Sequence, residues 1–89
     1  MATVTLDPLL AEFVPKRRLT SDAPNVEDLL SDLERRYPAL KFRLRDEAGS
    51  IRRFVKVFVN GQELRTLRGP ATPLAASDSV DVLHSIQGG

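Results

Sequence analysis

The last two residues of the sequence, Gly88 and Gly89, are the ones whose type and position suggest chemistry. Taken as the end of the chain, they offer a carboxylate on a residue without a side chain, shortly after the apolar residue Ile86. A carboxyl carbon with no Cβ beside it can pass through a narrow channel to a nucleotide phosphate, and glycine also adopts the positive φ angles that such a passage needs. These residues therefore indicate either an end that another protein activates or a flexible tail without a role.

Other reactive groups are few in this chain. There is no cysteine, which excludes disulfides, thiolate metal sites and a cysteine nucleophile. The single histidine, His84, argues against a zinc site built by the protein alone. Nothing in the sequence pairs with His84, so we predict that it packs against the tail or faces solvent and is not a general base.

Length and composition predict one soluble domain over residues 1–89. The chain is long enough for one modest core, and its apolar fraction of 42% and charged fraction of 28% are close to those of globular domains. No apolar run approaches the roughly 18 residues of a membrane span, and the first residues lack the pattern of a secretory signal. We expect a cytoplasmic monomer that makes no membrane contact.

Basic residues concentrate in the middle of the chain. The segment from Arg35 to Arg68, here called the basic zone, holds ten basic residues against three acids, whereas the remainder holds three basic residues against nine acids. Such a zone is a solvated surface, a docking surface for an acidic partner, or a nucleic-acid site. The ten are Arg35, Arg36, Lys41, Arg43, Arg45, Arg52, Arg53, Lys56, Arg65 and Arg68.

The segment from Val26 to Tyr37 is predicted to be the main helix. Its apolar residues recur at i, i+3, i+4, i+7 and i+11, which places them on one helical face. Asn25 is a good N-cap with Asp28 three positions later, and Pro38 ends the helix. Acids lead the segment and arginines close it, as the helix dipole favours.

Alternating patterns predict the strands. We expect strands at residues 3–6, 16–20, 51–59, 62–67 and 79–83. Asn60-Gly61 is the preferred pair for a type I′ turn between the third and fourth of them. Two apolar segments are ambiguous: residues 9–14 form a connection or a single helical turn, and residues 40–44 form a strand or a short irregular segment.

The order strand, strand, helix, strand, strand, strand predicts a two-layer α+β domain, in which the helix covers one face of a mixed sheet of four to five strands. If the valines of the third and last strands face the helix, Phe58 and Leu83 lie on the opposite face. Two large apolar side chains there suggest a contact patch. The alternative is two isolated exposed side chains, which are common on protein surfaces.

Three segments together resemble the ubiquitin-like β-grasp sulfur carriers, which include the small subunit of molybdopterin synthase and the thiamine-pathway carrier. Residues 53–63, RFVKVFVNGQE, resemble the hairpin of the branch that supplies sulfur to cysteine synthases. Residues 74–80, LAASDSV, resemble the entry to the last strand, and residues 82–89, VLHSIQGG, resemble the tail. Ser77 departs from the usual glycine, and His84 and Ser85 stand where proline is common.

This resemblance implies a β-grasp domain with a flexible tail at 84–89 and a function as carrier rather than enzyme. In the family, an ATP-dependent enzyme adenylates the terminal glycine, a sulfur donor converts the adenylate to a thiocarboxylate, and sulfide passes to an acceptor. The implied partners are this adenylating enzyme and a sulfur-accepting enzyme of biosynthesis, such as a cysteine synthase. No cofactor is bound by the carrier, because ATP is used by the partner.

The same resemblance assigns roles to five residues. Gly89 is the site of adenylation and sulfur attachment, Gly88 gives a slim approach, and Ile86 anchors the tail in the partner. Phe58 and Leu83 form the docking patch, with arginines of the basic zone at its rim. The acceptor stays open between cysteine, molybdopterin, thiamine, tRNA and other thio-metabolites.

Two other functions remain open from the sequence. A ubiquitin-like modifier, joined to lysines through Gly89, begins with the same adenylate. A nucleic-acid-binding module would use the basic zone, but four Phe and one Tyr give no aromatic and basic pattern typical of a single-strand platform.

Overall fold

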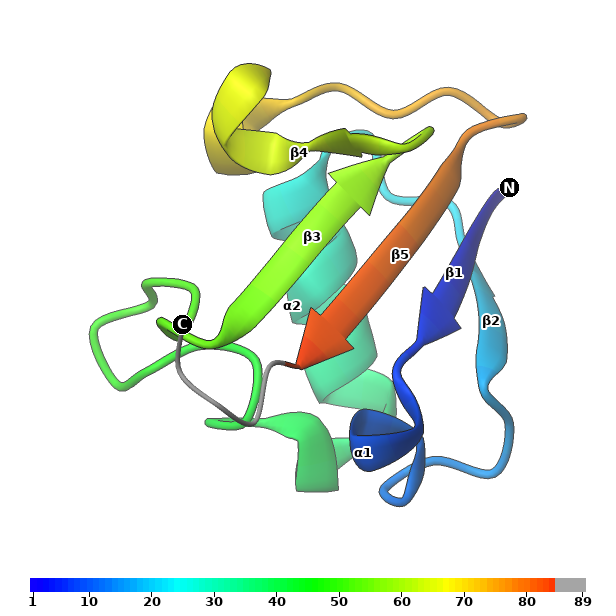
Figure 1. Cartoon of the computed structure of the whole chain (residues 1–89). Coiled ribbons are helices and arrows are strands. Elements are labelled where there is room, and N and C mark those ends of the chain that lie inside the picture. The colour runs from blue at the N-terminus through cyan, green and yellow to red at the C-terminus, as the bar shows by residue number, and fades with distance from the viewer. Residues whose placement is uncertain (85–89) are drawn as a thin grey trace.

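The computed structural model describes residues 1–84, which form one sheet, one long helix and several short helical turns (Figure 1). The strands are β1 (Ala2–Leu6), β2 (Arg18–Ser21), β3 (Val55–Val59), β4 (Gln62–Glu63) and β5 (Ser79–His84). The helices are α1 (Pro8–Ala11) and α2 (Val26–Arg36), with 3₁₀ turns at Pro38–Leu40, Leu64–Thr66 and Gly69–Ala71. The predicted order of strands and helix is confirmed.

The sheet has the order β2-β1-β5-β3-β4, and α2 crosses behind it in Figure 1. β1 and β5 are parallel neighbours at its centre, and the other pairs are antiparallel. The predicted two-layer α+β architecture with a mixed sheet is therefore confirmed. This topology places β5, the strand that leads into the tail, between two paired neighbours.

Helix α2 forms where its pattern predicts it. The Asn25 side chain accepts a hydrogen bond of 2.8 Å from the backbone N–H of Asp28, which caps the first turn. The helix buries one stripe against the sheet, made of Val26, Leu29, Leu30 and Leu33. The facing side chains Val4, Leu6, Val80 and Val82 of the two central strands are also completely buried. These two surfaces supply half of the buried residues of the core, whose apolar burial stabilises the fold.

The turn between β3 and β4 is also as predicted. Asn60 and Gly61 have φ angles of 52° and 83°, which is the pair of positive values that a type I′ turn requires. The prediction of a longer fourth strand at 62–67 is wrong, because β4 ends at Glu63. Leu64 turns into the core and the chain continues as a 3₁₀ turn, in which the Leu67 N–H donates to the Leu64 carbonyl.

The segment between α2 and β3 follows the irregular alternative. Leu40 and Leu44 are both completely buried, and their spacing of four residues suits a helical turn. Phe42 lies between them with a φ angle of 67° and is 49% exposed. The prediction that the third strand begins at Ile51 is wrong, since β3 begins at Val55. The alternation of apolar and basic residues over 40–45, which resembles a strand, thus comes from two buried leucines in a turn with an exposed phenylalanine between them.

An ion pair holds this segment against α2. Arg45 donates two hydrogen bonds to the Glu34 carboxylate, at 2.5 and 3.1 Å, and one of 3.0 Å to the Ser31 hydroxyl. Both charged side chains are largely buried. The hydrogen bond to Glu34 raises the pKa of Arg45 above its ordinary value although burial opposes it. Bidentate geometry makes this pair a directional tether rather than a loose surface contact.

Asp78 links the β3–β4 turn to the start of β5. Its carboxylate accepts a hydrogen bond of 2.7 Å from the Ala75 N–H and one of 3.0 Å from the Asn60 amide. The Asn60 side chain in turn accepts from the Ser79 N–H at 2.9 Å. The Ala75 N–H and then the Asn60 amide lower the pKa of Asp78, since both bonds favour the charged carboxylate.

We predict that Asp78→Asn removes a pH-dependent part of the stability. Because the pKa of Asp78 is lower in the folded than in the unfolded chain, its stabilisation is fully present above the unfolded pKa and is lost as the pH falls through the folded pKa. The variant should melt a few degrees below wild type at pH 7. The melting temperatures of the two proteins should converge as the pH falls through the folded pKa of Asp78.

The control for this titration is Asp22→Asn. Asp22 is exposed, and its carboxylate makes no hydrogen bond within residues 1–84. Its melting temperature should follow that of wild type across the same pH series. A constant difference between Asp78→Asn and wild type at every pH would contradict the assignment.

Candidate functional site

The predicted reactive end lies outside the described residues. Gly89, Gly88 and Ile86 follow residue 84, where the described chain ends. The structure does show how the tail is presented, because His84 is the last residue of β5 and pairs with Val55. The strand therefore extends one residue beyond the predicted end at Leu83.

The root of the tail is held by the centre of the sheet. β5 pairs with β1 from Ser79 to Val82 and with β3 from Val80 to His84. The Asp7 N–H also donates a hydrogen bond of 2.8 Å to the Val82 carbonyl. β5 is therefore held by β1 up to Val82 and by β3 up to His84, so the last described residue has a fixed position in the sheet.

The structure brings Phe58 and Leu83 together on the face opposite α2. In the β3–β5 register Leu83 lies across from Lys56 and Phe58 across from Asp81, so the two apolar residues are diagonal neighbours. Diagonal pairs in an antiparallel sheet lie about 7–8 Å apart. Leu83 is 41% exposed and Phe58 is partly exposed. Phe58 and Leu83, here called the outer patch, thus form one contiguous surface next to the tail.

The basic zone is partly neutralised in the folded protein. Within residues 1–84, ion pairs engage Arg35 and Arg36 with Asp32, Arg45 with Glu34 and Arg65 with Glu63. The other six basic residues form no ion pair in this part of the chain. They lie in the segment between α2 and β3, in β3, and just after the turn that follows β4: Lys41, Arg43, Arg52, Arg53, Lys56 and Arg68.

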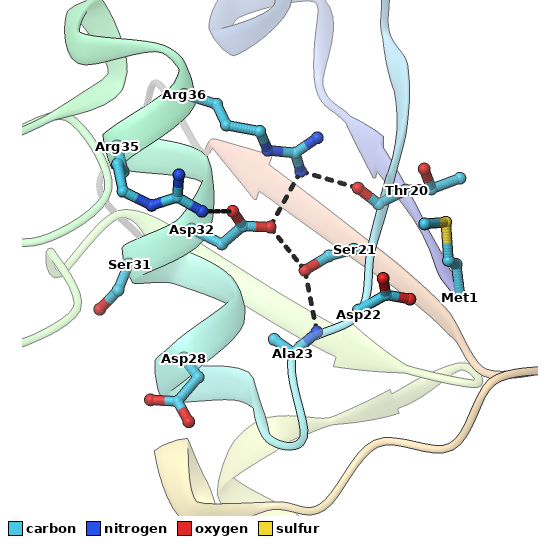
Figure 2. A pocket seen from close by; sticks show the side chains of 10 residues that line it. All are labelled: Met1, Thr20, Ser21, Asp22, Ala23, Asp28, Ser31, Asp32, Arg35 and Arg36. Carbon is cyan, nitrogen blue, oxygen red and sulfur yellow. Dashed lines mark hydrogen bonds and ion pairs between the residues drawn. The ribbon is translucent and has the colours of Figure 1, made fainter.

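A hollow of about 590 Å³ lies between β2 and α2, at the edge of the sheet two strands away from β5 (Figure 2). Figure 2 shows the Asp32 carboxylate at its centre, where it accepts hydrogen bonds from Ser21 at 2.8 Å and from Arg35 at 2.5 Å. Arg36 lies 3.2 Å from the same carboxylate and donates to the Thr20 carbonyl at 2.7 Å. These groups satisfy one another, and Arg36 covers the edge of β2 against pairing with another chain.

The described residues hold no cluster of three or more histidine and acidic side chains that could bind a metal ion. Among residues 1–84, no helix is long and apolar enough to cross a membrane. The candidate residues of the described part are the outer patch and the unpaired basic side chains.

Comparisons with known proteins agree with this arrangement. Residues 9–89 match the ThiS family. The sulfur carrier protein CysO of Mycobacterium tuberculosis is 33% identical over 76 residues, which cover 83% of this chain and 82% of CysO. Small archaeal modifier protein 3 of Haloferax volcanii is 39% identical over 72 residues, covering 81% of this chain and 76% of that protein. Small archaeal modifier protein 1 of Methanosarcina acetivorans has a similar structure, with a TM-score of 0.90 and 28% identity over 99% of this chain and 95% of that one.

These similarities confirm the predicted ubiquitin-like β-grasp fold. They also confirm the predicted class, since ThiS-type and CysO-type sulfur carriers are small carrier proteins and not enzymes. The relatives include both a sulfur carrier and a modifier, which are the two functions that the sequence left open. Because the match extends over nearly the whole sequence, the chain belongs to the ThiS family.

Proposed function

We propose that this protein is a sulfur carrier, and that the carboxylate of Gly89 is the group that carries the sulfur. The observation that supports this most directly is the similarity to a sulfur carrier protein across 83% of the chain, together with a Gly-Gly end placed five residues after a strand at the centre of the sheet. The chain has no cysteine, so sulfur would have to be carried on an acquired group.

The chemistry requires a partner enzyme. A free carboxylate is a poor acyl donor, because its negative charge repels nucleophiles and oxide is a poor leaving group. The partner joins the Gly89 carboxylate to the α-phosphate of ATP and releases pyrophosphate. Sulfide then displaces AMP to give the thiocarboxylate, which transfers its sulfur to an electrophilic acceptor and, with water, returns the carboxylate. Charges that stabilise the phosphates must come from the partner.

The acceptor enzyme that we propose first is one resembling a cysteine synthase, with an activated serine as substrate. The resemblance of residues 53–63 to the carrier branch of cysteine synthesis supports this choice. Comparing sulfur transfer to an activated serine with transfer to molybdopterin, thiazole or tRNA acceptors tests it. Transfer to another acceptor at a higher rate would reassign the pathway without changing the carrier chemistry.

A modifier function is the second candidate, and the similarity to small archaeal modifier protein 3 supports it. In this function the Gly89 adenylate is passed to lysines of target proteins as an isopeptide. The first step is the same in both functions, so only the fate of the adenylate separates them.

One incubation separates the two candidates. The carrier, the adenylating enzyme, ATP and a sulfide source are mixed, and the intact mass of the carrier is measured. Exchange of one oxygen for sulfur, followed by a further gain in mass when the thiocarboxylate sulfur is alkylated, supports the carrier function. Isopeptide-linked products without that exchange support the modifier, and a carrier whose mass never changes contradicts both.

A further inference from the structure

A pocket of about 390 Å³ opens beside the end of β5, on the side of the sheet that α1 and α2 cover. Its apolar wall comes from α1 and the turns around it, with Leu9, Leu10, Phe13 and Phe42. Its polar groups are Glu12, Arg43, Arg52 and His84. Figure 1 shows α1 and the segment that follows α2 close to the tip of β5. We call this the tail-root pocket, and it lies on the other side of the sheet from the outer patch.

The two arginines of the tail-root pocket are held in place without an acidic partner. The Arg43 guanidinium lies 3.9 Å from the centre of the Phe13 ring, and its Nε donates to the Ala39 carbonyl at 3.2 Å. The Nε of Arg52 donates to the Phe42 carbonyl. Within residues 1–84 neither arginine forms an ion pair. The terminal nitrogens of both arginines are therefore available to donate hydrogen bonds to the carboxylate of a partner, in the bidentate arrangement that arginine favours.

The wall of the tail-root pocket is unusually exposed. Phe42 is 49% exposed and Leu9 is 39% exposed. Phe42 also has a φ angle of 67°, a conformation that costs phenylalanine about 1–2 kcal/mol relative to the right-handed region. His84 has a buried Nδ1 with no hydrogen-bond partner within residues 1–84. An exposed phenylalanine and leucine beside two arginines without ion pairs resemble the composition of interfaces, in which aromatic residues and arginine are enriched.

We propose that the tail-root pocket is a second docking surface, and that it binds an acidic segment of the adenylating enzyme. A carboxylate of that segment would pair with Arg43 and Arg52, and an adjoining apolar side chain would pack against Phe42 and Leu9. This inference rests on the proposed adenylation of Gly89. Glu12 on the pocket wall makes a polyanion such as RNA a poorer match than one carboxylate.

The adenylating enzyme is the partner that this position favours. Gly88 and Gly89 carry no side chains, so an enzyme that admits them must recognise the folded body around the root of the tail. The outer patch borders that root on one side of the sheet, and the tail-root pocket borders it on the other. Adenylation is also the one step common to the carrier and modifier functions, so the surface is needed in either case.

The test replaces both arginines by glutamate and measures thiocarboxylate formation at increasing carrier concentration. The variant Arg43→Glu/Arg52→Glu should raise the KM for the carrier about tenfold or more and leave kcat within about twofold, because the tail itself is unchanged. The matched control, Lys16→Glu/Arg18→Glu, changes the net charge equally at two exposed sites outside the pocket. It should raise KM less than threefold, and its remaining effect should vanish at high salt.

A second variant tests whether a raised KM could instead come from a destabilised fold. Phe42→Asn suits a φ angle of 67°, since asparagine tolerates this region, and it removes the exposed ring. It should keep or raise the melting temperature and still raise KM severalfold. Arg43→Gln/Arg52→Gln should give an effect between wild type and the double glutamate variant.

The outcomes distinguish this inference from the proposed function. If wild type is never adenylated or thiocarboxylated, the proposed function fails. If wild type is converted and the KM of the pocket variants is unchanged or matches that of the Lys16/Arg18 control, the docking inference alone is wrong. If only transfer to the acceptor enzyme weakens, the pocket belongs to that enzyme and the proposal is overturned.

Discussion

Deletion of Gly89 is expected to abolish thiocarboxylate formation and to leave the free energy of unfolding within about 0.5 kcal/mol of wild type. The deletion moves the reacting carbon back by one residue, about 3.3–3.6 Å of extended chain. A misplacement of about 1 Å in an active site already costs about 10²-fold in rate. The fold should not respond, because the buried side chains of the last strand end at Val82.

The measurement is the intact mass of the carrier after incubation with the adenylating enzyme, ATP and a sulfide source, with a thermal melt of each variant alongside. Gly88→Trp keeps the length of the tail and should block conversion by bulk alone. Gln87→Ala keeps both the length and the two glycines and should be converted like wild type. Thiocarboxylate formation by the deleted chain would remove Gly89 from the mechanism.

Replacing either residue of the outer patch is expected to weaken binding of the adenylating enzyme by about 2 kcal/mol, or about thirtyfold. The substitution has to be chosen from the register. Leu83→Asp places a carboxylate across from Lys56, so it should form an ion pair on the free protein and cost little stability. Phe58→Lys is preferred to an acid, because Phe58 lies across from both Asp81 and Glu63.

Affinity is measured by calorimetry or by competition with wild type in the adenylation assay. Thr3→Asp is the control, since Thr3 lies in β1 and pairs with Ser79, away from Phe58 and Leu83. It should bind the enzyme like wild type. If Leu83→Asp and Phe58→Lys both bind the adenylating enzyme with the affinity of wild type, the outer patch does not take part in docking.

Local patterns were sufficient for part of this structure. The stripe on α2 and its Asn25 cap are decided within a dozen residues, and the Asn60-Gly61 turn is decided within four. The alternation of Val55, Val57 and Val59 likewise identified β3, because a strand with one buried face has a period of two. Each of these signals is produced and satisfied by neighbouring residues.

Sequence patterns gave the wrong secondary structure where packing into the core, rather than local periodicity, decided the backbone conformation. Residues 40–45 alternate like a strand, yet the space under α2 accepts Leu40 and Leu44 from a turn and leaves Phe42 outside. β4 stops after two residues because Leu64 is drawn inward. The tail-root pocket could not be predicted from local patterns either, because it joins residues from three separate segments: α1, the segment after α2 and the end of β5.

The sequence by itself led to the proposal that Gly89 carries the sulfur, because a chain without cysteine has no thiol of its own for that purpose. It also determined the order of strands and helix, and through its resemblance the family. Only the tertiary structure decided that Arg45 meets Glu34, whereas Arg43 meets the Phe13 ring and Arg52 meets the Phe42 carbonyl. The physical reason is that these contacts join residues ten or more positions apart, which no local pattern encodes, whereas Arg35, Arg36 and Arg65 pair with acids two to four residues away.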